Sequence, residues 1–184
     1  LEALGYLRSR DDVDVNQIGL IGFSQAGWVM PRVLTQDSGV AYAVFISTAI
    51  NWRQQGQFLT QQRLLSLDLT EQQIQAALAY NQAMDERLAS GISYQAYLNY
   101  RQQYQPESFQ GPAMSKPRFE FVINNIHADI EHELSAISQP VLAVFADSDQ
   151  QVDIEHSLSV YFEQIESRFS HHIYPDADPG LFKK

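Results

Sequence analysis

The chain has 184 residues, of which 45% are hydrophobic and 18% charged, a composition that fits a globular protein with a sizeable buried core. The formal net charge of -10 at pH 7 excludes a phosphate-binding surface, so we expect no nucleic-acid partner. No cysteine is present, and no apolar run approaches the roughly 20 residues of a membrane span. We therefore expect a soluble chain without disulfides, zinc–thiolate sites or a membrane partner, with the cytoplasm slightly favoured over the periplasm.

The first residues predict a helix, because Leu1, Leu4 and Leu7 fall on one helical face. Neither a capping residue nor an initiator methionine precedes them, so the chain is expected to start inside an element. Residues 18–23 follow and are apolar on both faces. This pattern is typical of a central parallel strand that is covered by helices and paired on both sides.

A turn rich in small residues comes directly after that strand. Gly22 lies two residues before Ser24, and Ala26 and Gly27 follow it. Small residues suit a strained turn that lifts one serine, so Ser24 is the candidate nucleophile and the backbone amide of Gln25 the candidate oxyanion donor. The pattern departs from G-x-S-x-G because Ala26 occupies its last position. The alternative is an ordinary strand-to-helix turn with a capping serine.

The remaining elements predict an α/β fold. Strands are expected at 40–47, 141–146 and 171–174, and helices at 25–35, where Pro31 predicts a kink, and at 154–165. This order predicts the C-terminal half of a doubly wound, mostly parallel sheet, a partial core made of residues 1–50 and 140–184. The strand at 18–23 then has a free apolar edge, unless a missing N-terminal segment or another copy of the chain completes the sheet.

Residues 51–139 form an insertion with helical signals. Thr70 and Gln73 predict a capping box, Gly91 a helix end, and Ser93 the cap of a second helix that Pro106 terminates. A loop or hinge is expected at 109–121 and a short helix at 130–137. The insertion is either a helical lid over the carboxyl ends of the strands or an inert decoration. His127 and His132 fall on different faces, so no metal site is expected.

Several segments together resemble the α/β-hydrolase superfamily, nearest to its dienelactone-hydrolase, acyl-CoA-thioesterase and prolyl-oligopeptidase-like branches. They are the run Gly22-Phe23-Ser24-Gln25-Ala26-Gly27, the lead-in at 4–14, and the segments at 140–152 and 174–182. The resemblance implies a serine esterase or thioesterase that forms an acyl-enzyme and needs no cofactor. It also places a second oxyanion amide in a loop before residue 1, the triad acid in segment 140–152 and the triad histidine in segment 174–182.

Asp149 is the candidate triad acid. It follows the strand at 141–146, and its distance from that strand and from Val152 matches the family pattern. Asp147 is the second choice, because it lies nearer the strand end, and Asp153 is expected to cap the next helix. The alternative interpretation of Asp149 is an aspartate that only stabilises a turn.

The base is missing from its expected place, because Pro179 stands where the family has histidine. The five histidines lie elsewhere, at positions 127, 132, 156, 171 and 172. His171 and His172 are expected at the start of the last strand, opposite the Ser24 end, and His156 on an outer helix face. His127 would approach only if the insertion folded over Ser24. Three explanations stay open. The protein has naturally lost its base, a residue elsewhere in the chain acts as the base, or the sequence has been changed at Pro179.

The sequence therefore predicts a serine hydrolase that takes a small acyl substrate and is weakly active or inactive as it stands. The competing hypothesis is a non-catalytic module that binds a small acyl ligand or a partner chain. The proline at 179 favours the second hypothesis, and the intact turn around Ser24 favours the first.

Overall fold

The computed structural model describes every residue except 110, 179 and 182–184. The chain divides into two compact units, one of Leu1–Asn51 with Asp129–Lys184 and one of Trp52–Ala128. We call them the sheet unit and the insertion unit. The second boundary lies at residue 128 instead of 139, because the short helix α7 (Glu131–Ala136) packs into the core of the sheet unit through Leu134.

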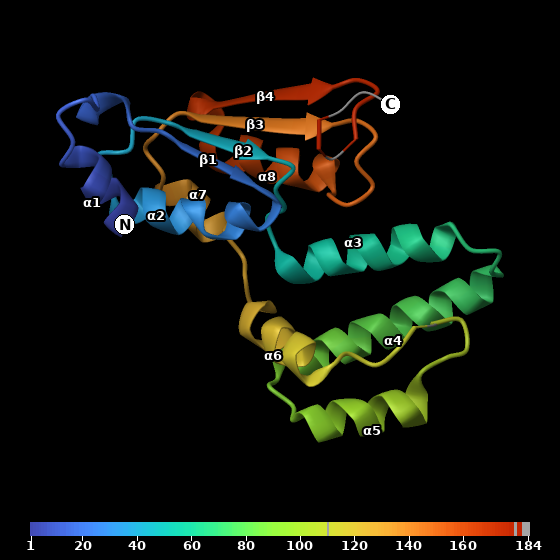
Figure 1. Cartoon of the computed structure of the whole chain (residues 1–184). Helices are drawn as coiled ribbons and strands as arrows, with labels where there is room; N and C mark the ends of the chain where they lie inside the picture. The colour runs from blue at the N-terminus through green and yellow to red at the C-terminus, as the bar shows by residue number, and fades with distance from the viewer. Residues whose placement is uncertain (110, 179, 182–184) are drawn as a thin grey trace. The chain divides into compact units, whose positions relative to one another are not determined.

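The sheet unit contains a four-stranded, all-parallel sheet in the order β1-β2-β3-β4 (Figure 1). The strands are β1 (Leu20–Phe23), β2 (Ala43–Ile46), β3 (Val141–Ala146) and β4 (Phe169–Tyr174). The predicted parallel sheet is confirmed, as is the prediction that the first strand pairs with the second and has no partner on its other edge among the described residues. Because all strands run in one direction, the loops that follow them gather at one end of the sheet.

The described helices of the sheet unit lie on one face of the sheet (Figure 1). They are α1 (Glu2–Arg8), α2 (Met30–Gln36), α7 and α8 (Ile154–Ile165), with short 3-10 helices η1 (Val15–Gln17), η2 (Ser24–Trp28) and η3 (Glu166–Arg168). Helix α8 has the predicted bounds, and the Asp153 side chain caps it by accepting a hydrogen bond from the His156 amide at 3.0 Å. The arginine at the end of α1, Arg8, forms a two-pronged ion pair with Asp37 after α2.

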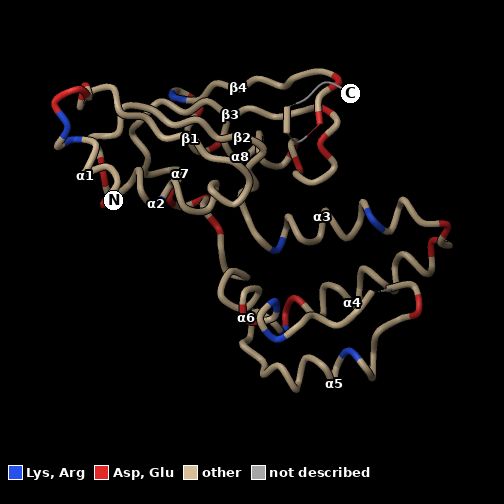
Figure 2. Tube along the Cα trace, viewed as in Figure 1, with Lys and Arg blue, Asp and Glu red and all other residues tan. Residues whose placement is uncertain are grey.

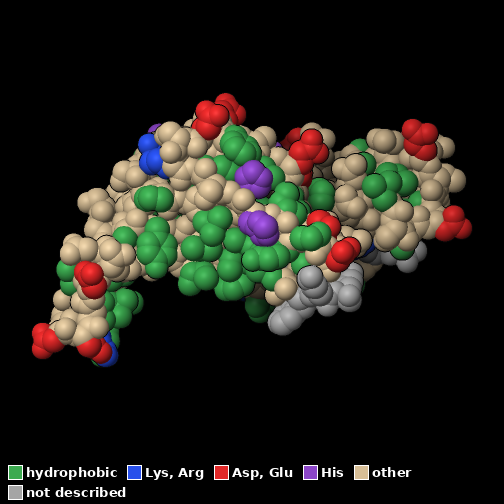
Figure 3. All heavy atoms as spheres, turned by 90° about the horizontal axis from the view of Figure 1, so that it is seen from above, with side chains coloured by type: hydrophobic (Ala, Val, Ile, Leu, Met, Phe, Trp, Pro, Cys, Tyr) green, Lys and Arg blue, Asp and Glu red, His purple; other side chains and the backbone are tan. Residues whose placement is uncertain are grey.

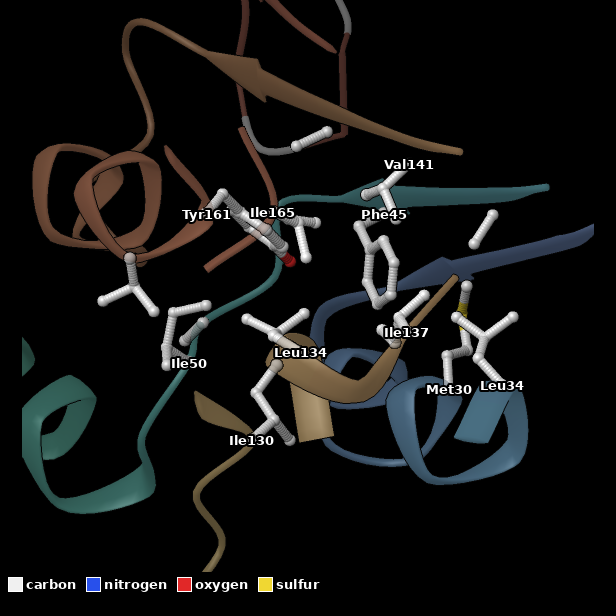
Figure 4. Packing of buried hydrophobic residues seen from close by; sticks show 14 of the residues in the cluster. Met30, Leu34, Phe45, Ile50, Ile130, Leu134, Ile137, Val141, Tyr161 and Ile165 are labelled. Atoms are coloured by element: carbon white, nitrogen blue, oxygen red, sulfur yellow. The ribbon is translucent and has the colours of Figure 1, made fainter. Parts of the chain in front are cut away.

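Alternate residues of the two central strands form the core of the sheet unit. Phe45 of β2 and Ala143 of β3 point toward the helices and are fully buried. Figure 4 shows the side chains that pack against them, which include Leu34, Leu134, Ile137, Tyr161 and Ile165. Burying this apolar area is the main favourable term in the stability of the unit.

The prediction that Pro31 kinks one continuous helix is wrong. The segment after Ser24 is divided at Val29 into η2 and α2, and Pro31 lies in the first turn of α2. A first-turn proline costs no hydrogen bond, because the first backbone N–H groups of a helix have no intrahelical partner. The proline therefore helps to start α2 instead of bending it.

The other face of the sheet is apolar and is not covered by any described helix of the sheet unit. On it lie Ile21 and Phe23 of β1, which are 66% and 56% exposed, and Tyr42, which is 46% exposed. In the view from above, hydrophobic side chains spread over this surface beside two histidines (Figure 3). We call it the open face. All-parallel sheets normally have both faces covered, so this surface is unusual for a chain that folds alone.

The insertion unit is helical. Its helices are α3 (Trp52–Leu65), α4 (Glu71–Ala89), α5 (Tyr94–Tyr104) and α6 (Lys116–Asn125). The capping box of Thr70 and Gln73 and the cap at Ser93 are confirmed. The prediction of a loop throughout 109–121 is wrong, because Ser115 caps α6 and Pro117 occupies its first turn. None of the described helices has the length and apolarity needed to cross a membrane.

Aromatic side chains form the core of the insertion unit. Tyr97 is buried against Phe119, and its hydroxyl accepts a hydrogen bond from the Met114 amide at 2.8 Å. Tyr80 stacks on Tyr100 with ring centroids 5.9 Å apart. These contacts fasten the α5–α6 segment to α4. Whether the unit acts as a lid stays a prediction.

Asp85 is a half-buried carboxyl group on α4. Burial raises its pKa to about 6, an effect that Arg53 partly offsets and Glu86 reinforces. The Asn81 amide nitrogen donates to Asp85 Oδ2 at 3.3 Å. Since the charged form is disfavoured in the folded state, ionisation of Asp85 lowers the free energy of unfolding as pH rises from about 4 to 6.

We predict that Asp85→Asn raises the free energy of unfolding at pH 7 and flattens its decline between about pH 4 and 6. Asparagine keeps an acceptor for Asn81 but has no charge to desolvate. Urea unfolding of both proteins across this pH range measures the effect. An equal loss of stability at pH 5 and pH 7 would contradict it, and Asp68→Asn, at an exposed position between α3 and α4, is the control.

Candidate active site

Ser24 lies at the point where β1 ends and η2 begins. Its backbone has φ 48°, the left-handed region that non-glycine residues rarely adopt, and its side chain is exposed. The predicted strained strand-to-helix turn is therefore present. Gln25 follows in the first turn of η2, where the helix itself provides no acceptor for the amide.

Close packing explains the small residues around Ser24. A Cβ atom at Gly27 would lie 2.6 Å from Cβ of Thr48, and one at Gly22 would collide with the side chains of Met30 and Ala26. Both glycines therefore let η2 press against the ends of β1 and β2. The motif G-x-S-x-G has its last glycine at the position of Ala26, but here the glycine is Gly27. Packing explains this displacement, because position 27 faces Thr48.

Thr48 and Tyr161 support this turn, and the sequence analysis did not identify them. Thr48 follows β2, is fully buried, and shares a 3.1 Å hydrogen bond with the Tyr161 hydroxyl of α8. Burial raises the pKa of Tyr161, so its hydroxyl stays neutral. The preceding Ser47 also has a positive φ of 46°. No sequence motif marks a threonine and a tyrosine 113 residues apart as partners.

Asp149 lies in the loop after β3 and is only 7% exposed. Its Oδ1 accepts hydrogen bonds from the backbone amides of Gln151 at 2.7 Å and Val152 at 3.3 Å. Its Oδ2 is buried and has no hydrogen-bond partner among the described residues. Buried carboxylate oxygens are normally paired, so Oδ2 is an acceptor without its donor.

Asp147 has a different function in the same loop. Its exposed carboxylate accepts a hydrogen bond from the Ser148 hydroxyl at 3.1 Å, and the backbone of the loop after β4, Asp176 foremost, lowers its pKa. The Asp147 amide also donates to the Tyr174 carbonyl at 3.1 Å. Acidic residues gather in these two loops (Figure 2). Asp147 therefore joins the two loops, while Asp149 keeps a free oxygen.

Ser24 and Asp149 lie at the same end of the sheet. They follow strands that are two positions apart, which corresponds to a lateral separation of about 10 Å. An imidazole ring that donates one hydrogen bond and accepts another spans about 8 Å between two oxygens. The topology therefore fits a base between the two residues.

The histidines of the sheet unit do not occupy that position. The prediction that His171 and His172 lie opposite the Ser24 end is wrong, because β4 begins earlier, at Phe169. His172 pairs with Val144 and lies level with Phe23. It is nevertheless three strands, or about 14 Å, from β1. It packs against the Tyr174 ring, and His171 stacks on Phe169.

The other histidines have local surroundings. The His127 Nε2 atom lies 3.0 Å from the Ala89 carbonyl within the insertion unit, His132 is exposed on α7, and His156 is half-buried in the first turn of α8. Pro179 lies outside the described residues. Within the part of the chain that the structure describes, no group of three or more His, Asp or Glu residues could hold a metal ion.

No family model matches the sequence, and no curated protein does. Solved structures do match in fold. A 2,6-dihydroxy-pseudo-oxynicotine hydrolase matches over 96% of this chain and 38% of its own, with a TM-score of 0.53 and 11% identity. A Pyrococcus furiosus esterase matches over 96% of this chain and 50% of its own, with a TM-score of 0.52 and 14% identity. An esterase domain of a Rhodothermus marinus protein matches over 97% of this chain and 58% of its own, with a TM-score of 0.50 and 14% identity.

These matches show the α/β-hydrolase fold for this chain. The chain spans between about two fifths and three fifths of the length of the three structures. What those proteins hydrolyse is a property of those proteins.

We predict that Gly27→Ala lowers the free energy of unfolding by about 1–3 kcal/mol, because the added methyl group meets the buried Thr48 side chain. Gly56→Ala is the matched control. It lies inside α3 with no atom within 4 Å of the added Cβ, and is expected to stabilise the insertion unit by about 0.5–1 kcal/mol. Urea unfolding measures both, and a neutral Gly27→Ala would show that η2 does not depend on this contact.

Proposed function

We propose that this chain carries the nucleophile and the acid of a serine hydrolase that cleaves a carboxylic ester or thioester through an acyl-enzyme. The observation that carries the proposal is the exposed Ser24 in a left-handed turn between a parallel strand and a helix. A strained backbone of this kind costs about 1–3 kcal/mol, and such strain concentrates at functional sites. An ordinary capping serine needs no such conformation.

In this mechanism Ser24 Oγ attacks the acyl carbon, and the Gln25 amide stabilises the oxyanion that forms. The hydroxyl proton passes to a base and then to the leaving alcohol or thiol. Water next attacks the acyl-enzyme, and its proton returns through the same base to Ser24 Oγ. Asp149 Oδ2 would orient the base, and the two amides on Oδ1 would keep the carboxylate fixed.

In this proposal, the lack of a base beside Ser24 limits the activity of the chain. None of the described histidines lies in the loops that follow β3 and β4, and the position where the resemblance expects the base is Pro179. Serine is a weak nucleophile without an adjacent base. The substrate would be a small acyl compound, with no cofactor taking part.

We predict slow or undetectable hydrolysis of p-nitrophenyl esters by this chain, and faster hydrolysis by Pro179→His. General-base assistance contributes roughly a hundred- to ten-thousand-fold, which sets the upper range of the gain. The rates of the chain, Ser24→Ala and Pro179→His on an ester series measure it, with Ser24→Ala in the Pro179→His background as the control. Robust Ser24-dependent turnover by the unmodified chain would show that another residue is the base, and His127 would be tested first.

Labelling with a fluorophosphonate probe separates the hydrolase from a module that only binds. A nucleophile in a working turn reacts with the probe, and Ser24→Ala removes the label. If neither the unmodified chain nor the Pro179→His variant is labelled, the hydrolase proposal is contradicted.

The open face and the free edge of β1 favour a second candidate function, binding of a partner chain. A strand that pairs with this edge would come from a partner polypeptide or from a second copy of the chain. Both would pair with β1, and helices that follow would cover Ile21 and Phe23. A hydrolase completed in this way and a binding module are both compatible with this surface.

We predict that the chain self-associates at high concentration and that Phe23→Lys weakens this association, because it places a charge on the open face. Phe162→Lys is the matched control, since Phe162 is 43% exposed on α8 at the helix side of the sheet. Analytical ultracentrifugation over a concentration series measures the effect. Equal weakening by both substitutions would argue against a specific role of the open face.

A further inference from the structure

The buried Oδ2 atom of Asp149 has no hydrogen-bond partner among the described residues, and its surroundings indicate what it would bind. Its carboxylate is held in one orientation, because Oδ1 accepts the amides of Gln151 and Val152. The loop itself is fixed to the loop after β4, where the Ser148 amide donates to the Ala177 carbonyl at 3.3 Å. Oδ2 therefore cannot turn toward solvent without breaking hydrogen bonds that are already formed.

An acceptor of this kind selects its ligand by chemistry. A buried carboxylate oxygen binds an N–H donor, and a hydrogen bond to a charged acceptor contributes more than a neutral one. A ligand that also serves Ser24 must accept a proton on its opposite side. Among small molecules, imidazole has both properties, with an N–H on one side and a basic nitrogen on the other.

We propose that the carboxyl end of the sheet binds an imidazole-type base supplied from outside the chain, with its N–H donated to Asp149 Oδ2 and its second nitrogen facing Ser24. An acyl substrate that carries such a ring would bring its own base. The binding part of this proposal needs only Asp149, whereas the rate part rests on the proposed hydrolase function. Gln150, Gln151 and Asp176, in the loops after β3 and β4, are exposed, so binding would begin with contact between the ring and these surface side chains.

The chemical step is balanced without any further reactant. The Ser24 Oγ–H proton moves to the free nitrogen as the Oγ–C bond forms, and passes to the leaving oxygen as the C–O bond breaks. Water then forms the new C–O bond of the acid product. Its proton passes through the same nitrogen to Ser24 Oγ, and imidazole is regenerated unchanged.

Binding is measured by titrating the ¹⁵N-labelled full chain with imidazole in the millimolar range expected for so small a ligand. We expect the amide resonances of Gln151 and Val152 to shift, because these amides share the Asp149 carboxylate. The matched chemical control is 1-methylimidazole, a base of similar strength that has no N–H to donate. The matched variant is Asp149→Asn, which keeps an oxygen for the two amides but replaces the free acceptor with an NH₂ donor.

Activity is measured as the imidazole-dependent hydrolysis of p-nitrophenyl acetate, from which the rate of Ser24→Ala is subtracted because imidazole alone cleaves this ester. We expect an increase of about tenfold or more, at the low end of what general-base catalysis contributes, and no increase with 1-methylimidazole or in Asp149→Asn. Shifts that depend on Asp149 without any rate increase would uphold the binding site and contradict the hydrolase function. Equal shifts with both bases, or none, would overturn the site, whether or not Ser24 is reactive.

Discussion

The contact between Gly27 and Thr48 is the constraint on which the rest of the site depends. It lets η2 begin at the end of β1 and lie against the end of β2, and this places Ser24 in the left-handed region at the surface. Thr48 cannot yield, because it is fully buried and bonded to Tyr161 of α8. The position of the serine is therefore set by packing between segments distant in sequence, and the backbone strain at Ser24 is offset by that packing.

The sequence was sufficient where local rules decide the structure. Small residues around Ser24, the alternation within the strands, and caps at Thr70 and Asp153 all predict elements that the structure contains. It was insufficient where tertiary contacts decide. The division of the helix before Pro31 depends on how η2 packs, and the position of His172 depends on the register with β3. The hydrogen bond between Thr48 and Tyr161 has no sequence signal at all.

The all-parallel sheet links the site to the open face. Parallel order brings the loops after β1 and β3 to one end, which is needed for a serine and an acid from different strands to act together. The same order calls for helices on both faces, and the described helices of the sheet unit cover one of them. The fold thus brings Ser24 and Asp149 to one end of the sheet and leaves Ile21 and Phe23 exposed on the open face.

The two carboxylates after β3 illustrate how one loop separates structure from chemistry. Asp147 is exposed, accepts the Ser148 hydroxyl, and has its pKa lowered foremost by the backbone of the loop after β4. Asp149 is buried and is fixed through one oxygen, while the other has no hydrogen-bond partner in the part of the chain that the structure describes. An aspartate that merely stabilised the turn would gain nothing from burying an unpaired oxygen, because that burial costs free energy. The burial of an oxygen that has no partner among the described residues therefore sets Asp149 apart from an aspartate that only stabilises a turn.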